Sequence, residues 1–216
     1  MTREHPRVAE ALAHHTKGRL AEAEAVYAAI LVDNPDDMDA LNLGGLALHA
    51  LGRSKEARAR LERAVRLMPE FPDPHANLGA VLRAAGELDA AAACFRRALE
   101  LDPANGLIAN NLGLVLMAQN LALEALGCFS QARTLLPGQP DILVNVAIAR
   151  MAMDDTAGAL ADLEMMAEAA PKNARGHYWR GRALGALGRD ADAKAAFETA
   201  LTLDPEHKEA KAALGR

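Results

Sequence analysis

Three asparagines, Asn77, Asn111 and Asn145, follow one another at intervals of thirty-four residues. A carboxamide carries N–H donors and a carbonyl acceptor, so it can hydrogen-bond to the main chain of another protein. A series of such amides would hold a peptide whatever its side chains are. The alternative is that the amides meet only water or one another.

Carboxylates and histidines recur at the same interval and raise the question of a metal site or an acid pair. Asp39, Asp73 and Asp141 share one column, but each opens a predicted helix, where a carboxylate caps backbone N–H groups. His15 and His49 share another column, and a spacing near one helix diameter is too long for a single metal ion to bridge. Helix capping and solvated histidines therefore account for these residues.

The two cysteines, Cys94 and Cys128, are also thirty-four residues apart. Neighbouring helices pack roughly 8 to 10 Å apart, whereas a disulfide needs Cα atoms within about 7 Å. The chain also lacks the CxxC spacing typical of zinc sites. We therefore predict free thiols, no metal and no cofactor. Since packing, turns and caps explain nearly every patterned position, we also predict no catalytic residue and no enzymatic activity in the chain.

Composition restricts the partners further. The formal charge of −5 opposes binding to a phosphate backbone, which relies on clustered Lys and Arg, so nucleic acid is not an expected partner. The first residues, MTREHPRVAEALAHHTKG, carry charges and histidines where a secretory signal needs an uninterrupted apolar core. No stretch reaches membrane-spanning length. We therefore predict a cytoplasmic protein with no membrane partner.

The elements that position these residues follow from a proline that recurs every thirty-four residues with no slip. The series is Pro35, Pro69, Pro103, Pro137, Pro171 and Pro205. Twelve residues before each proline stands an alanine, which indicates a close helix crossing: Ala23, Ala57, Ala91, Ala125, Ala159 and Ala193. A column of large apolar residues comes eight before: Tyr27, Leu61, Phe95, Phe129, Leu163 and Phe197. A column of small residues comes twenty-four before: Ala11, Gly45, Gly79, Gly113, Ala147 and Gly181.

A turn is predicted in the middle of each unit. Seventeen residues before each proline lie the residue types that best tolerate the left-handed backbone at the end of a helix: Gly18, Gly52, Gly86, Asn120, Asp154 and Gly188. Each unit therefore consists of a helix, a short turn, a second helix and a proline-marked turn. In the third unit we expect Asp73 to cap the first helix and the second helix to run from about Leu88 to Leu101. A single hairpin cannot bury both of its faces, so the units must stack.

The chain resembles the tetratricopeptide repeat family in its period and in the column of small residues, the mid-unit glycine, the alanine, the large apolar residue and the proline. The segment GELDAAAACFRRALELDP looks like the second helix of that family's repeat. The resemblance implies an all-α, right-handed superhelical solenoid of six helix-turn-helix repeats plus a short C-terminal capping helix. We predict a single array over 1–216. Its repeats are approximately 4–37, 38–71, 72–105, 106–139, 140–173 and 174–207, and its cap is 208–216.

The resemblance also implies that the asparagine column lies on first helices and faces a concave groove. A repeat step of roughly 10 Å matches about three residues of extended chain at about 3.3 Å each, so one amide could hold every third residue. The same helices would present a row of apolar side chains, the apolar stripe, beside the amides. The alternative is that some of these side chains pack into the wall of the superhelix. The candidate peptide-binding residues are Asn77, Asn111, Asn145, Leu114, Ile148, Met117, Trp179 and Arg182.

Trp179 takes the place of an asparagine in this column and could anchor a ligand, or it could pack against the final helix, expected over 206–214. The family's clamps for chaperone tails use inward Lys and Arg to bind carboxylates. Only Arg83, Arg175 and Arg182 are plausible inward bases here, so a ligand of that kind is not expected.

These observations predict a protein-interaction module that binds a peptide or helical segment of a partner protein in its groove. The first units, GRLAEAEAVYAAILVDNPDDMDALNLGGLALHALGR, look similar to arrays that precede bacterial glycosyltransferase domains of the O-linked N-acetylglucosamine transferase type. The module could therefore select substrates for a larger glycosyltransferase. The alternative function is a self-assembling scaffold, which would make the protein a homo-oligomer.

Overall fold

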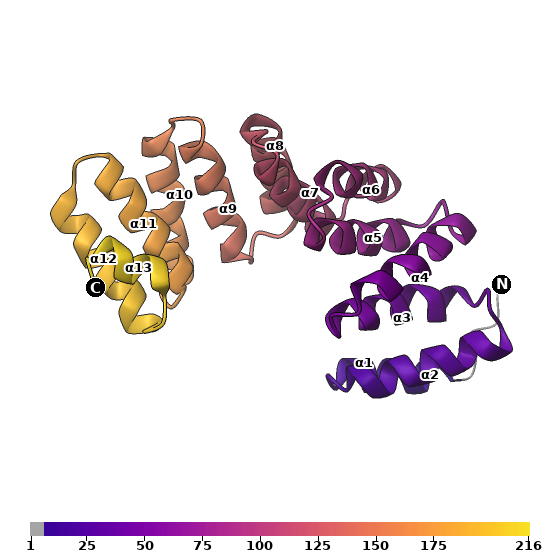
Figure 1. Ribbon diagram of the computed structural model, residues 1–216. Helices are drawn as coiled ribbons and strands as arrows, with labels where there is room; N and C mark the ends of the chain where they lie inside the picture. Colours follow the sequence, from indigo (N-terminus) through magenta and orange to yellow (C-terminus); the bar gives the residue numbers. More distant parts are fainter. Residues whose placement is uncertain (1–6) are drawn as a thin grey trace. The chain divides into compact units, whose positions relative to one another are not determined.

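The structure of the protein is a computed structural model, and it describes residues 7–216. Over this range every regular element is an α-helix, and the helices pair into antiparallel hairpins (Figure 1). The chain divides into two compact units, one ending at Ala104 and the other beginning at Asn105. The predicted all-α fold of six helical hairpins and a short final helix is confirmed.

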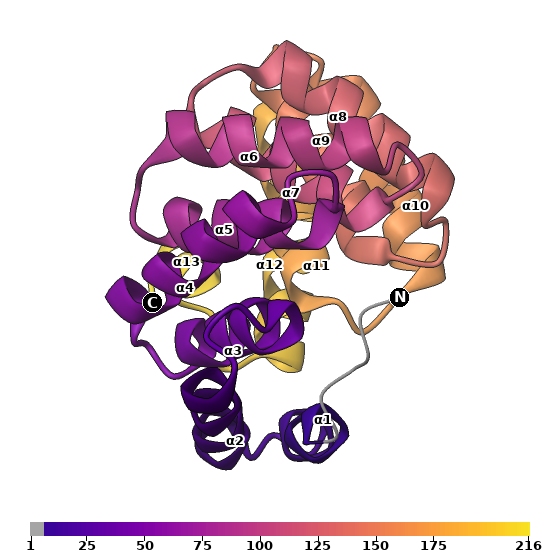
Figure 2. The same ribbon diagram turned by 90° about the vertical axis from the view of Figure 1, so that its right-hand side faces the viewer.

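The first unit holds three hairpins, which stack in chain order (Figures 1 and 2). Their helices are α1 (Val8–Thr16), α2 (Leu20–Asp33), α3 (Met38–Ala50), α4 (Ser54–Leu67), α5 (Pro72–Ala84) and α6 (Leu88–Leu101). The first helix of each hairpin contacts the first helix of the next, as α3 does with α1 and α5. Helix α6 covers the range predicted for it from the sequence.

The second unit holds three more hairpins and the short helix α13, which packs against α12. Its helices are α7 (Gly106–Ala118), α8 (Ala122–Leu135), α9 (Pro140–Met151), α10 (Thr156–Ala169), α11 (Ala174–Ala186), α12 (Asp190–Leu203) and α13 (Lys208–Ala213). Helix α9 contacts both α7 and α11, so the three first helices of this unit lie side by side.

Each hairpin closes through a contact between the large and the small columns. Phe95, Phe129 and Leu61 are fully or almost fully buried, and each faces the glycine of its own hairpin's first helix. A β-carbon added to Gly113 would lie 2.5 Å from the ring of Phe129. The alanine column is buried throughout, with Ala193 the most exposed at 5%. The predicted alternation of large side chains and holes is therefore confirmed.

The mid-hairpin turns adopt the predicted left-handed backbone at every position. The φ angle is +78° at Gly86, which has no β-carbon to strain. Two of the turns use other residues, Asn120 at φ 62° and Asp154 at φ 63°. Asn and Asp tolerate this region better than other side chains, which is why they can replace glycine here.

The prediction that Asp73 caps a helix is wrong, and so is the same prediction for Asp39 and Asp141. Each lies inside the first turn of its helix; the N-cap of α5 is Phe71 and that of α9 is Gln139. The reason in α5 and α9 is a proline, which fits the first helical position because it has no N–H group to satisfy there. The carboxylates instead lie where the helix dipole favours a negative charge.

We predict that Gly113→Ala destabilises the second unit. The new methyl group has no free space against the buried ring of Phe129, so the free energy of unfolding should fall by about 1–3 kcal/mol. Gly127 is the matched control, because it is exposed within α8 and nothing lies within 4 Å of an added β-carbon. Gly127→Ala should instead stabilise the protein by about 0.5–1 kcal/mol through helix propensity. Chemical denaturation measures both values, and equal effects would contradict the packing described.

Candidate functional site

The asparagine column lies on the first helices, with Asn77 on α5 in the first unit and Asn111 and Asn145 on α7 and α9 in the second. Two of these amides pair with an amide of the preceding first helix. Asn77 Nδ2 donates to Oδ1 of Asn42 on α3 at 2.9 Å. The contact recurs in the second unit at the same distance, where Asn145 Nδ2 donates to Oδ1 of Asn110 on α7.

Sequence reasoning missed these partners. Asn42 and Asn110 stand sixty-eight residues apart, two periods, in the column immediately before the asparagine column. This spacing could have indicated the amide pairs in the sequence, because residues at adjacent positions of the repeat on two neighbouring helices can face each other. Asn77 and Asn145 therefore each use one N–H within the protein, and their partners are amides outside the asparagine column.

Asn145 is the most fully bonded of the three. Its side chain is 5% exposed, and its Oδ1 accepts a hydrogen bond from Arg175 Nη2 on α11 at 2.8 Å. Arg175 Nη1 lies 3.9 Å from Oδ1 of Asp141, which also accepts a hydrogen bond from Asn173 Nδ2. Burial lowers the pKa of the Arg175 guanidinium, and the Asp141 carboxylate only partly opposes this effect. A continuous polar network thus joins α7, α9 and α11.

Asn111 differs from its two counterparts. It is half-buried, and its side chain makes no hydrogen bond with any other part of residues 7–216. The donors and the acceptor of this amide are therefore not used by hydrogen bonds within the described residues. Leu114 and Met117, three and six residues further along α7, are also half-buried. An available amide next to adaptable apolar side chains is the combination that holds a backbone and tolerates varied side chains.

The residues of the apolar stripe on α7 and α9 differ in what they contact. Ile148 and Met151 on α9 pack against the buried cluster of the second unit, so a part of each surface belongs to the wall of the hairpin stack. Both remain half-buried rather than buried. The sequence-based alternative that some of the stripe packs into the wall therefore applies to these two residues.

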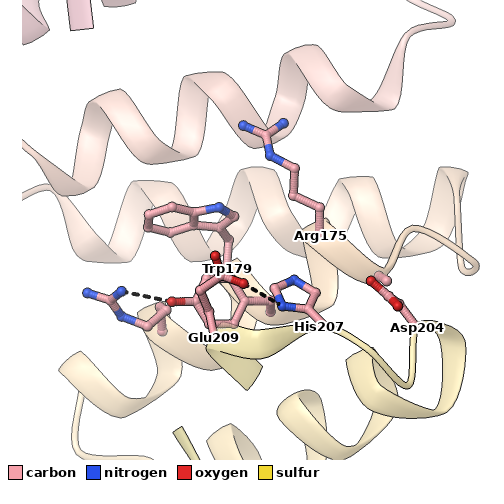
Figure 3. Close-up of a pocket in the computed structure, with 8 residues that line it drawn as sticks. Arg175, Trp179, Asp204, His207 and Glu209 are labelled. Atoms are coloured by element: carbon pink, nitrogen blue, oxygen red, sulfur yellow. Dashed lines mark hydrogen bonds and ion pairs between the residues drawn. The ribbon is translucent and has the colours of Figure 1, made fainter. Parts of the chain in front are cut away.

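Trp179 and Arg182 lie together on α11 beside a pocket of about 470 Å³ (Figure 3). The Trp179 ring meets Tyr178 edge to face, with centroids 5.5 Å apart, and the Arg182 guanidinium lies 5.5 Å from the Trp179 centroid. Arg182 Nη1 donates to the Tyr178 hydroxyl at 3.1 Å. Arg175 lies on the same side of the pocket, and Asp204, His207 and Glu209 lie across from it.

The sequence predicts that Trp179 either anchors a ligand or packs against the final helix, and the structure shows that its neighbour Tyr178 also contacts the final segment. Tyr178, 8% exposed, stacks against His207 at the start of the final segment with ring centroids 4.9 Å apart. Trp179 packs against the same buried cluster yet remains half-buried and lines the pocket. The contact with the final segment is therefore made mainly by Tyr178, and part of the Trp179 ring remains exposed in the pocket.

Residues 7–216 hold no group of three or more His, Cys, Asp or Glu side chains that could bind a metal ion. Neither Cys94 nor Cys128 forms a disulfide within the described residues, and burial raises the pKa of the Cys94 thiol. In the same part of the chain no helix has both the length and the apolar character needed to cross a membrane.

Comparisons with known proteins agree with this architecture. The tetratricopeptide repeat family matches residues 8–73, 72–105 and 174–207. Repeats of this family are non-catalytic interaction modules, in agreement with the predicted lack of enzymatic activity. No curated protein matches the chain in sequence.

Solved structures with the same fold include YrrB, a tetratricopeptide repeat protein with an unusual peptide-binding site, at 19% identity and a TM-score of 0.71 over 88% of this chain and 98% of that one. PilF from Pseudomonas aeruginosa is 18% identical, with a TM-score of 0.82 over 96% of this chain and 95% of its own. PilW, a type IV pilus biogenesis factor, is 17% identical, with a TM-score of 0.86 over 96% of both chains. At these identities the likeness concerns the fold.

We predict that Asn145 and Asn111 differ in their effect on stability. Asn145→Ala leaves Oδ1 of the half-buried Asn110 and an N–H of the charged Arg175 side chain without their partner, so the free energy of unfolding should fall by about 1–3 kcal/mol. Asn111→Ala removes no internal hydrogen bond and should change it by no more than about 0.5 kcal/mol. Urea titration of both variants measures the difference. A loss of the same size at Asn111 would show that its amide is structural.

Proposed function

The chain belongs to the tetratricopeptide repeat family, and we propose that it is a protein-interaction module that binds an extended segment of a partner protein along its first helices. The observation that carries the proposal is the available amide of Asn111, which stands beside the half-buried Leu114 and Met117 on α7. The peptide-binding site described for YrrB supports the same use of this fold. We further propose that the six hairpins act as one array with the repeat boundaries given above.

The site has a main-chain part and a side-chain part. Asn111 would exchange hydrogen bonds with one peptide unit of the ligand, and Leu114, Met117 and Ile148 would contact the ligand's apolar side chains. Neighbouring first helices lie about 10 Å apart, so a segment that crosses α7, α9 and α11 advances roughly three residues per helix. Such a ligand would reach Trp179 and Arg182 on α11 after passing Ile148 on α9.

The three asparagines have different roles in this proposal. Asn111 is the principal contact because its amide is not engaged elsewhere. Asn77 and Asn145 already donate to neighbouring amides, so they hold the helices in register and offer a ligand less. This ranking differs from a ladder of three equivalent contacts, and it comes from the hydrogen bonds rather than from the spacing.

A narrower proposal rests on the resemblance of the first units to arrays that precede glycosyltransferase domains. In that case the array selects protein substrates for a transferase in the same polypeptide. The test is the coding sequence beyond Arg216: a glycosyltransferase domain there supports the narrower proposal, and a stop codon or an unrelated domain contradicts it. The cytoplasmic location predicted from the sequence is part of the same proposal.

Self-assembly is the competing function, and its partner would be a second copy of the chain. Light scattering over a range of concentrations separates the two, because a module that binds other proteins stays monomeric while a scaffold grows with concentration. A stable dimer that loses peptide binding would indicate that the first-helix surface is used for assembly.

We predict that Asn111→Ala weakens partner binding without unfolding the protein. The ligand's peptide unit would lose its hydrogen-bond partner in a partly dry groove, at a cost of about 1 kcal/mol and up to about 3 kcal/mol. Since the partner is unidentified, the ligands are synthetic dodecapeptides selected from a displayed random library against the full chain. Their affinity is measured by calorimetry, and thermal unfolding is recorded on the same samples.

The control is Asn34→Ala, which deletes the same amide at the C-cap of α2 in the first unit, outside the helices α7, α9 and α11 that carry the proposed site. It should bind these peptides as the unchanged protein does. Unaltered affinity in Asn111→Ala, or a loss of similar size in the control, would remove the residue-level support for the proposal.

A further inference from the structure

One face of α11 carries two arginines with a tryptophan between them. Arg175, Trp179 and Arg182 are spaced four and three residues apart, which places them in a row along the helix. Both arginines are exposed and Trp179 is half-buried. All three line the pocket of about 470 Å³. This row therefore offers a ligand two guanidinium groups and an aromatic surface at one site.

The two guanidinium groups are held mainly by neutral partners. Arg182 donates to the Tyr178 hydroxyl and lies over the Trp179 ring, and it forms no ion pair within the part of the chain that the structure describes. Arg175 donates to Asn145, and Asp141, at 3.9 Å, lies at the limit of an ion pair. Elsewhere arginines pair closely with carboxylates, as Arg58 does with Glu87 at 2.6 Å. The arginines of this row are thus oriented without close neutralisation of their charge.

The opposite wall of the pocket is acidic. Asp204 Oδ1 accepts a hydrogen bond from the backbone N–H of Glu206, and Glu209 Oε2 lies 3.1 Å from Nδ1 of His207. These carboxylates would repel a strongly charged anion that entered the pocket, because like charges at close range cost free energy. Among the anionic groups that the arginines can bind, one with a single negative charge meets the least repulsion from these carboxylates.

We propose that this pocket binds an acidic side chain, Asp or Glu, of the partner segment, with a neighbouring apolar side chain of the same segment resting on Trp179. The inference rests on the proposed function and adds the chemistry of the ligand. A carboxylate matches the planar fork of a guanidinium and can accept two parallel hydrogen bonds from it. Because Tyr178 and Trp179 already restrict Arg182, less side-chain entropy is lost when the ligand binds.

The carboxylate belongs to a side chain rather than to a chain terminus. A segment that follows the first helices from α7 passes this pocket while it is held by its main chain, and so it does not need to end there. A phosphorylated side chain is the less favoured ligand because its second charge would face Asp204 and Glu209.

The test uses Trp179 as its own reporter, since it is the only tryptophan in the chain. Amidated dodecapeptides selected from a displayed random library are titrated into the full chain while tryptophan fluorescence is recorded. We expect the selected peptides to be enriched in Asp or Glu next to an apolar residue. Changing that acid to Gln or Asn in the peptide should weaken binding at least about tenfold, and this comparison leaves the protein unaltered.

Protein variants make the assignment specific. Arg182→Gln should abolish the difference between the acidic peptide and its amide counterpart, and Arg182→Lys should restore part of it. Arg180→Gln is the matched control, because Arg180 lies on the same helix but lines a different pocket with Glu164 and Glu168. It should retain the full difference, and circular dichroism confirms that each variant is folded.

Each contrary outcome has a distinct meaning. Equal binding of the acidic and amide peptides, or a difference that survives in Arg182→Gln, overturns this inference while binding that depends on Asn111 still supports the proposed function. Tighter binding of a phosphoserine peptide, or a requirement for a free terminal carboxylate, also overturns it. Failure of any peptide to bind the unaltered chain overturns both proposals.

Discussion

The contact between a large side chain of each second helix and a small residue of its first helix is the constraint on which the structure depends. Phe129 lies so close to Gly113 that no β-carbon fits between them. This close approach turns one face of the first helix toward its own hairpin partner. The face carrying Asn111, Leu114 and Met117 is then left outside that contact, so residues there can vary without loosening the hairpin.

The first helices carry the residues of the proposed binding site, and some of the same residues also stabilise the protein. Asn42 with Asn77, and Asn110 with Asn145, join successive first helices through one amide hydrogen bond each. Each of these amides uses one N–H for a hydrogen bond inside the protein. In Asn145 the carbonyl oxygen is used as well, because it accepts a hydrogen bond from Arg175. The three asparagines therefore differ in how many hydrogen-bonding groups they could still offer a ligand, and Asn111 could offer the most.

The sequence predicted the helices well because their boundaries follow from local sterics and from a period repeated six times. Helix α6 has the predicted bounds, and the left-handed turns include Asn120 and Asp154 where glycine is absent. The prediction failed for Asp73 because the cap depends on where the helix starts, and α5 starts at Pro72, two residues earlier than a cap at Asp73 requires. The amide pairs were not predicted because they depend on which positions face each other across two helices, which a single column does not reveal.

Residues outside the shared pattern distinguish one hairpin from the next. Asp162 occupies a column that holds Cys94 and Cys128 in the preceding units, yet it is 4% exposed and pairs with Arg133 and Arg150, each at 3.2 Å. Burial raises the pKa of its carboxyl group, and this effect outweighs the two arginines. A charge buried with two specific partners is therefore a feature of α8, α9 and α10 rather than of the repeat.

Helix α11 also departs from the repeat pattern, on the side that we propose to face the ligand. Trp179 replaces the asparagine of the shared column, and Arg182 replaces the apolar residue that is Leu114 on α7 and Ile148 on α9. These two exchanges leave the closing contact between Gly181 and Phe197 intact. The hairpin does not need either side chain to close, so neither exchange is explained by the packing of the repeat. In the proposed function, these two side chains on α11 therefore determine which ligands bind, while Asn111 on α7 binds the ligand's main chain whatever its sequence.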